Sequence, residues 1–199
     1  MKIAAKILIN SLGGEKMDYN RALELLHEYT KSENLLRHAL CVETAMRCYA
    51  KKFGEDEEKW AITGLLHDFD YEKYPDEHPY RGAEILRSMG VEEEIVEAIL
   101  GHANYTGVKR STLLAKTLFA VDELSGFLYA YALVRPTKNL KDVKLKSIKK
   151  KLKDKAFARG VNREDITTGA EELGIELGQH ILFVAQCLQN NAKALGLEE

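Results

Sequence analysis

The chain has 199 residues, of which 45% are hydrophobic and 30% are charged, and its net charge at pH 7 is −2. These proportions are typical of a globular protein and exclude a disordered, collagen-like or disulfide-scaffold chain. No run approaches the roughly 20 apolar residues that a membrane helix requires, so we expect no membrane partner. The three cysteines form no Cys-X-X-Cys pair, which disfavours a zinc finger and predicts a reducing, cytoplasmic location.

The start of the chain, MKIAAKILINSLGGEK, lacks the full apolar region and the cleavage site of a signal peptide. We therefore treat residues 1–16 as an N-terminal extension of uncertain structure. By length, residues 17–199 are expected to form one domain.

Apolar residues recur at three- and four-residue steps almost throughout, which predicts helices rather than strands. Asn34 and Asn162 are candidate N-caps, and Gly54 is a candidate helix end. The expected helices span 18–31, 34–53, 56–69, 79–90, 92–103, 111–134, 142–158 and 175–195. The fold class is therefore all-α, with a core at about 34–128 and a helical C-terminal extension at about 136–199.

Four of the expected helices place a His or Asp on the apolar face or at its end. These residues are His38, the pair His67–Asp68, His102 and Asp122. A single polar residue in such a position is usually a hydrogen-bonded core group, and a carboxylate facing a core is costly unless it is paired or metal-bound. Imidazoles and carboxylates directed at one core suit Fe, Mn, Zn or Co, so the pattern predicts a metal site.

His38, the segment LLHDFD with His67–Asp68, and AVDELSG with Asp122 resemble the metal-dependent HD-domain phosphohydrolase superfamily over about residues 34–128. The resemblance implies an HD-domain helical bundle in which these four side chains bind a catalytic metal. Over about residues 20–190, the chain is also similar to a group of predicted HD-superfamily hydrolases without an assigned substrate.

Two further segments, HPYRGAEIL with His78 and AILGHANY with His102, resemble the extra histidines of HD proteins that hold two metals. The resemblance implies a six-residue set in which Asp68 bridges the ions, and one or two divalent ions remain open. Fe or Mn is the expected metal, with Zn, Co, Ni or Mg as alternatives. Tyr71 and Ala103 depart from patterns of some two-metal relatives, which disfavours a cyclic-dinucleotide phosphodiesterase.

The resemblance implies a phosphohydrolase that uses a metal-activated water to cleave a phosphate ester of a nucleotide or small phosphorylated metabolite. His67 and Asp68 would belong to its catalytic centre. Asp70 and Glu72 could orient water or protonate the leaving oxygen, or could simply be solvated loop residues. The alternatives are an HD-fold di-iron oxygenase and a non-catalytic binding or sensor module.

A basic segment, 138–163, contains eleven Lys and Arg against two Asp. It predicts either a solvated helix face or a funnel for a small anionic phosphorylated substrate. The candidate phosphate contacts are Arg135, Lys138, Lys149, Arg159 and Arg163. The absence of interleaved aromatic residues disfavours nucleic acid as a partner, and the sequence leaves a homo-oligomer open.

Overall fold

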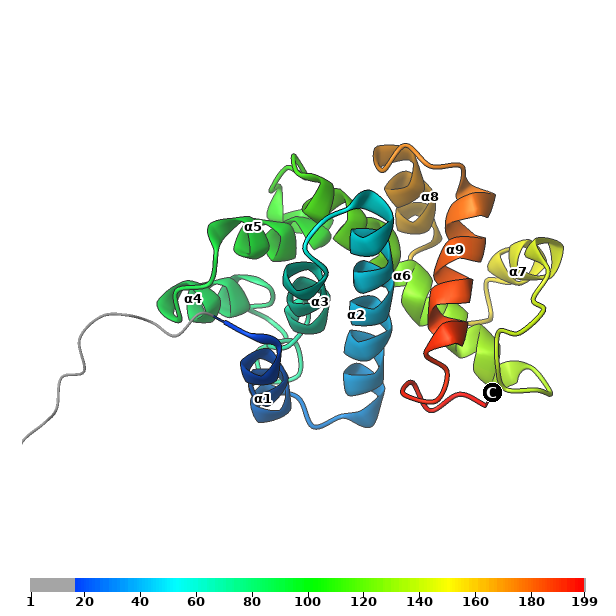
Figure 1. Ribbon diagram of the computed structural model, residues 1–199, viewed down its shortest axis with the longest axis horizontal. Coiled ribbons are helices and arrows are strands. Elements are labelled where there is room, and N and C mark those ends of the chain that lie inside the picture. The colour runs from blue at the N-terminus through cyan, green and yellow to red at the C-terminus, as the bar shows by residue number, and fades with distance from the viewer. Residues whose placement is uncertain (1–16, 199) are drawn as a thin grey trace, which may run out of the picture.

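A computed structural model describes residues 17–198 of the chain (Figure 1). The helices are α1 Tyr19–Tyr29, α2 Glu33–Phe53, α3 Glu57–Leu66, α4 Tyr80–Ser88, α5 Glu93–His102, α6 Leu113–Val134, α7 Leu145–Leu152, α8 Arg163–Glu172 and α9 Leu177–Asn190, with a short 3-10 turn, η1 Asn104–Thr106, after α5. Within these residues there is no strand, which confirms the all-α prediction. The predicted extension, 1–16, lies outside the described residues.

Short polar side chains determine where several of the helices begin. Asp18 caps α1, Asp56 caps α3 and Thr112 caps α6, each by accepting a hydrogen bond from a backbone N–H of the first turn. Asn162 caps α8 in the same way, as predicted. Gly54 ends α2 with a φ of 76°, a left-handed conformation that glycine adopts without steric cost.

The two longest helices, α2 and α6, cross the middle of the bundle (Figure 1). Helix α2 packs against α3, α6 and α9, and α6 also packs against α5, α8 and α9. Buried side chains from α1 through residues 192–197 form one hydrophobic cluster. The C-terminal helices therefore share a core with the segment that carries the predicted ligands.

By length and composition alone, helix α6 is long and apolar enough to cross a membrane. The expectation that no segment approaches the length and apolar character of a membrane helix is therefore wrong. More than half of the most apolar window of α6 is buried inside the protein. The same composition is typical of a core helix, because a helix that is covered on most sides has no need of a polar face.

Two glycines permit close contacts between helices. A Cβ on Gly64 of α3 would lie 2.9 Å from the Cα of Glu43 on α2, and one on Gly169 of α8 would lie 2.5 Å from the Cα of Ala120 on α6. Real Cβ atoms do not approach backbone so closely. The absence of a side chain at these two positions therefore lets α3 approach α2 and lets α8 approach α6.

The basic helix is shorter than predicted: α7 covers Leu145–Leu152 rather than 142–158. Asp142 and Ala158 have φ values of 52° and 42°, which a right-handed helix cannot contain. Beyond α7, the Asp154 carboxylate accepts a hydrogen bond from the backbone N–H of Ala156, an alternative to helical bonding. The last helix is also shorter than predicted: α9 covers Leu177–Asn190 rather than 175–195.

Candidate metal centre

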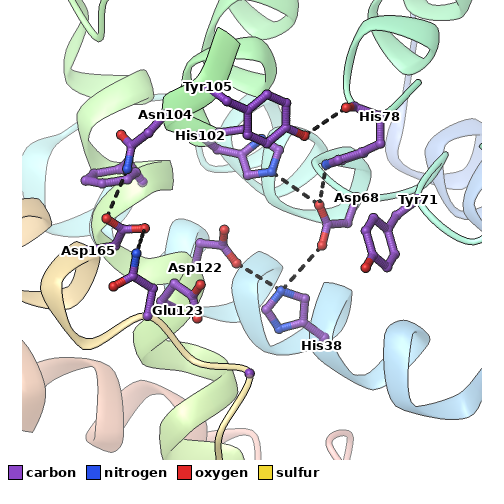
Figure 2. Close-up of a pocket in the computed structure, with 14 residues that line it drawn as sticks. His38, Asp68, Tyr71, His78, His102, Asn104, Tyr105, Asp122, Glu123 and Asp165 are labelled. Atoms are coloured by element: carbon purple, nitrogen blue, oxygen red, sulfur yellow. Dashed lines mark hydrogen bonds and ion pairs between the residues drawn. The ribbon is translucent and has the colours of Figure 1, made fainter. Parts of the chain in front are cut away.

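The structure brings the six predicted ligands together, and Figure 2 shows all of them except His67. They form two groups, and in each group three donor atoms lie within 4.8 Å of one another. The first group is His38, His67 and Asp122, and the second is Asp68, His78 and His102. Four of the six side chains stand at helix ends or in the turns that follow them.

The first group joins α2, α3 and α6. The Nε2 atom of His38 lies 2.9 Å from Oδ1 of Asp122 and 3.2 Å from Nε2 of His67. His67 follows the last residue of α3 and is completely buried, and its Nε2 lies 3.4 Å from the same Asp122 oxygen. Donor atoms from α2, from α6 and from the residue that follows α3 therefore face one another.

Asp68 belongs to the second group but also faces the first, and it directs a different oxygen toward the histidines of each (Figure 2). Its Oδ2 lies 3.4 Å from His67 and 3.8 Å from His38. Its Oδ1 lies 3.2 Å from Nε2 of His78 and 3.3 Å from Nε2 of His102. A carboxylate in this position can contribute one oxygen to each of two cations.

Backbone carbonyls fix two of the imidazoles in orientation. Nδ1 of His67 lies 2.8 Å from the carbonyl oxygen of Gly64, and Nδ1 of His102 lies 2.5 Å from that of Ile99. Each Nδ1–H donates to its carbonyl, which leaves the Nε2 lone pair directed at the centre. This arrangement is typical of histidines that bind metals.

Asp70 orients the third imidazole. Its Oδ1 lies 2.7 Å from Nδ1 of His78, and its Oδ2 accepts a hydrogen bond of 2.7 Å from the backbone N–H of Gly82. A Cβ on Gly82 would lie 2.8 Å from this carboxylate, so a glycine is required there. Asp70 is fully buried behind His78 and does not line the pocket, so its expected contact with water or a leaving oxygen does not match its position.

The charges of the cluster favour a cation among its carboxylates. Burial opposes ionisation of Asp68 and Asp122, yet the facing histidines hold the pKa of both carboxyl groups well below the usual range. Burial likewise opposes protonation of His67, yet the two carboxylates raise its pKa well above its usual range. Two half-buried carboxylates that stay ionised require positive charge beside them, and with the four imidazoles they form a donor set that fits divalent metal ions.

The centre opens into a pocket of about 560 Å³. Beyond the ligands, the pocket is lined by residues that the sequence analysis did not assign to the site, apart from noting Tyr71 and Ala103 as departures and Asn162 as a helix cap: Tyr71, Ala103, Asn104, Tyr105, Phe119, Glu123, Gly160, Asn162 and Asp165. Burial, and then the neighbouring charge of Asp122, raises the pKa of Glu123 to about 7. Asp165 and Asn162 come from the start of α8, so the C-terminal extension closes one side of the pocket.

Glu72 and the basic residues lie outside this pocket. The Glu72 carboxylate accepts hydrogen bonds from the backbone N–H groups of Lys31 and Ser32 just before α2, so its predicted role at the centre does not match its position. Lys138 lies 4.0 Å from Glu198, at the C-terminal end of the described chain.

The remaining basic candidates have similar local roles. Arg135 donates to the carbonyl oxygens of Asn139 and Lys141, and Arg163 donates to three carbonyls in the loop before α8. Lys149 lies 3.9 Å from Glu176, and Arg159 is exposed next to the pocket-lining Gly160. The predicted phosphate contacts are therefore not brought to the ligands.

Comparison with known families identifies the segment of the chain that carries the ligands. Residues 35–126 match the HD domain family. The matched segment contains His38, the His67–Asp68 pair and Asp122. This part of the chain is an HD domain, as the sequence resemblance implied.

Several curated proteins are similar to the same region. Ribonuclease Y of Lawsonia intracellularis is 36% identical over 107 residues, which cover 52% of this chain and 20% of that protein. Ribonuclease Y of Oleidesulfovibrio alaskensis is 30% identical over 106 residues, again 52% of this chain and 20% of that protein. An uncharacterized protein of Methanocaldococcus jannaschii is 35% identical over 85 residues, 40% of this chain and 50% of that protein.

The chain thus spans about a fifth of the length of the ribonuclease Y relatives and half of the Methanocaldococcus protein. No solved structure matches the chain significantly.

Proposed function

We propose that this protein is a metal-dependent phosphohydrolase that cleaves a phosphate ester of a nucleotide or another small phosphorylated metabolite. The observation that carries the proposal is the position of Asp68, whose two oxygens face two separate groups of ligands. One carboxylate can thereby hold two cations side by side at the base of the pocket. Bound divalent cations would polarise the phosphate ester and activate a water molecule for attack.

The chain's own residues have positioning roles in this proposal. His38, His67 and Asp122 would hold one ion, His78 and His102 would hold the other, and Asp68 would bind both. No Ser, Thr or Cys is among the residues that line the pocket, so the pocket offers no hydroxyl or thiol nucleophile of these three types, and a water molecule is the proposed nucleophile. The pocket volume of about 560 Å³ suits a small ester.

Imidazole and carboxylate ligands together suit iron, manganese, zinc or cobalt, and of these we expect iron or manganese. The name ribonuclease Y supports hydrolysis of phosphate esters, but these relatives share only a segment with this chain. We favour a small substrate over a nucleic acid strand because no Lys or Arg lines the pocket to neutralise flanking phosphates.

The test combines metal analysis with an assay of phosphate release. Protein purified without chelator and supplied anaerobically with Fe²⁺ or Mn²⁺ should bind two ions and release phosphate from p-nitrophenyl phosphate. Asp122→Ala should lose metal from the first group and lower the rate by more than about 100-fold, a larger loss than that of a residue that only supports a ligand. Glu72→Gln, which removes a nearby carboxylate outside the pocket, is the matched control.

Unchanged metal content and rate in Asp122→Ala would refute the proposed centre. A loaded protein that releases phosphate from none of the monoesters, nucleotides or RNA tested would refute the proposed reaction. Oxygen consumption by such a protein would move the assignment to a di-iron oxygenase, and absence of bound metal would move it to a binding module.

A further inference from the structure

One wall of the pocket contains a carboxylate, that of Asp165, which is not hydrogen-bonded to any of the six proposed metal ligands. Asp165, in the first turn of α8, accepts hydrogen bonds from two amide side chains (Figure 2). Its Oδ1 lies 3.0 Å from Nδ2 of Asn104, and its Oδ2 lies 2.8 Å from Nδ2 of Asn162. All three residues line the pocket that opens from the metal centre.

The two amides orient the Asp165 carboxylate without neutralising it. An ionised carboxylate has about four lone-pair sites on its two oxygens, and each oxygen here uses one of them for an amide N–H. No Lys or Arg side chain is among the residues that line this pocket. Asp165 therefore keeps acceptor capacity for a hydroxyl or amine group of a bound molecule.

The position of this carboxylate is fixed from the other side of the pocket wall. Arg110 donates to Oδ1 of Asn104 at 3.1 Å and forms two further hydrogen bonds to the carboxylate of Glu172 at the end of α8. Its guanidinium also lies 3.7 Å from the ring centre of Phe119. Arg110 thus holds the loop after α5 against α8, so Asp165 belongs to a preorganised wall rather than to a free surface.

We propose, on the basis of the proposed function, that Asp165 is a specificity-determining residue that accepts a hydrogen bond from a sugar hydroxyl of a phosphate monoester. Carboxylates are common partners of ribose hydroxyls in nucleotide sites. The phosphate would lie at the six ligands while the sugar reaches Asp165. The substrate class is therefore the monophosphate of a hydroxyl-bearing sugar.

The charge of the pocket excludes longer phosphate chains from this class. A pair of divalent cations would be balanced by the ligand carboxylates and by a single phosphate dianion. A second or third phosphate would share the pocket with the carboxylates of Glu123 and Asp165, and no Lys or Arg is among the residues that line it. A diphosphate or triphosphate should therefore bind less well than the matching monophosphate.

Two aromatic rings favour a nucleoside as the sugar-bearing group. The side chains of Tyr71 and Tyr105 line the pocket and are 45% and 67% exposed. The Tyr105 hydroxyl donates to the carbonyl oxygen of His78, which holds this ring beside the second ligand group. Exposed rings so placed offer stacking surfaces for a nucleobase.

The experiment measures kcat/KM of the metal-loaded protein for adenosine 5′-monophosphate, its 2′-deoxy and 3′-deoxy forms, ribose 5-phosphate, ATP and p-nitrophenyl phosphate. Asp165→Asn should lower the ratio of kcat/KM for the ribose monophosphates to that for p-nitrophenyl phosphate by about tenfold, the value of one hydrogen bond to a charged group. In the unaltered protein, kcat/KM for the 2′-deoxy or the 3′-deoxy form should be lower than that for adenosine 5′-monophosphate by a similar factor. This arm tests the same contact without relying on a variant.

Glu164→Gln is the matched control, because Glu164 is an exposed carboxylate in the same turn of α8 and does not line the pocket. It should leave the ratio unchanged. A higher kcat/KM for ribose 5-phosphate than for adenosine 5′-monophosphate would place the specificity in the sugar alone. The role of Asp165 is still supported in that case if Asp165→Asn lowers kcat/KM for both esters relative to p-nitrophenyl phosphate.

An unchanged ratio in Asp165→Asn with intact metal content, or a preference for ATP, would overturn the inference and leave the proposed function standing. Failure of the proposed function is distinct, because no ester would then be hydrolysed. In that case calorimetric binding of adenosine 5′-monophosphate decides the role of Asp165. Equal affinities in the two proteins would overturn it, and weaker binding by Asp165→Asn would support it.

Discussion

The Asp70→Asn substitution removes one charge from a side chain that is fully buried and hydrogen-bonded through both oxygens. His78 and the backbone N–H of Gly82 both donate to Asp70, but an Asn side chain has only one oxygen to receive them. One buried donor must then face an amide N–H, at a cost of about 1–3 kcal/mol. Since Asp70 orients the Nε2 atom of His78, we expect the affinity of the second ligand group for a cation to fall by about 10–100-fold.

The assay is a titration of the metal-free protein with Mn²⁺ or Zn²⁺ in competition with a chelator. The unaltered protein should bind two ions, and Asp70→Asn should weaken one of the two steps by about 1.4–2.7 kcal/mol. Glu72→Gln is the control, because its carboxylate is used only by the backbone at the start of α2. If a folded Asp70→Asn variant binds both ions with unchanged affinity, the proposed role of Asp70 is refuted. Equal weakening of both binding steps would also refute it, since Asp70 contacts only the second ligand group.

Three further changes test other parts of the structure. His102→Ala removes one donor from the second ligand group and none from the first, so elemental analysis should give a metal content that falls from two ions toward one. Arg110→Lys cannot reproduce the paired hydrogen bonds to Glu172, and urea denaturation should give a free energy of unfolding lower by about 1–2 kcal/mol, whereas an unchanged midpoint would contradict the anchoring of α8. Burial lowers the pKa of His180, whose ring nitrogen accepts a hydrogen bond from the hydroxyl of Tyr49. As the pH falls below about 6.5, the unfolded state takes up this proton before the folded state does, so the free energy of unfolding decreases. It should decrease less steeply in His180→Gln, and equal slopes would count against the assignment.

Five of the six ligands could be predicted from a local sequence signal, whereas His78, in a loop without periodicity, is implied only by the family resemblance. His38 and Asp122 interrupt apolar helix faces, and the His67–Asp68 pair stands where a periodic apolar pattern ends. Adjacent residues of a regular helix point about 100° apart, which is why the pair needs a helix end to face one centre. The structure ends α3 at Leu66, one residue before that pair.

The supporting contacts could not be predicted in the same way. The bond between Asp70 and His78 spans a run of turns without periodicity, and the bond between Asn104 and Asp165 joins residues 61 positions apart. Asn162 gave a partial signal, because its sequence position predicted a helix cap. Its second contact, the hydrogen bond to Asp165 three residues further on, is also local to the start of α8. The placement of that turn beside Asn104 instead depends on how α8 packs against α6, where Gly169 permits the close approach.

The basic residues illustrate why charge alone is a poor guide to a binding site. An arginine in a loop carries five N–H donors, and nearby carbonyl groups compete for them with any ligand. Arg135 and Arg163 both donate to carbonyl oxygens of the loops around α7, so their donors help to hold those loops in place. In the pocket, by contrast, the lining side chains are acidic, aromatic or neutral apart from the histidines. The positive charge that a phosphate needs would therefore come from cations held by the histidines and aspartates, which is the reason the acidic pocket, rather than the basic segment, is the candidate site for an anionic substrate.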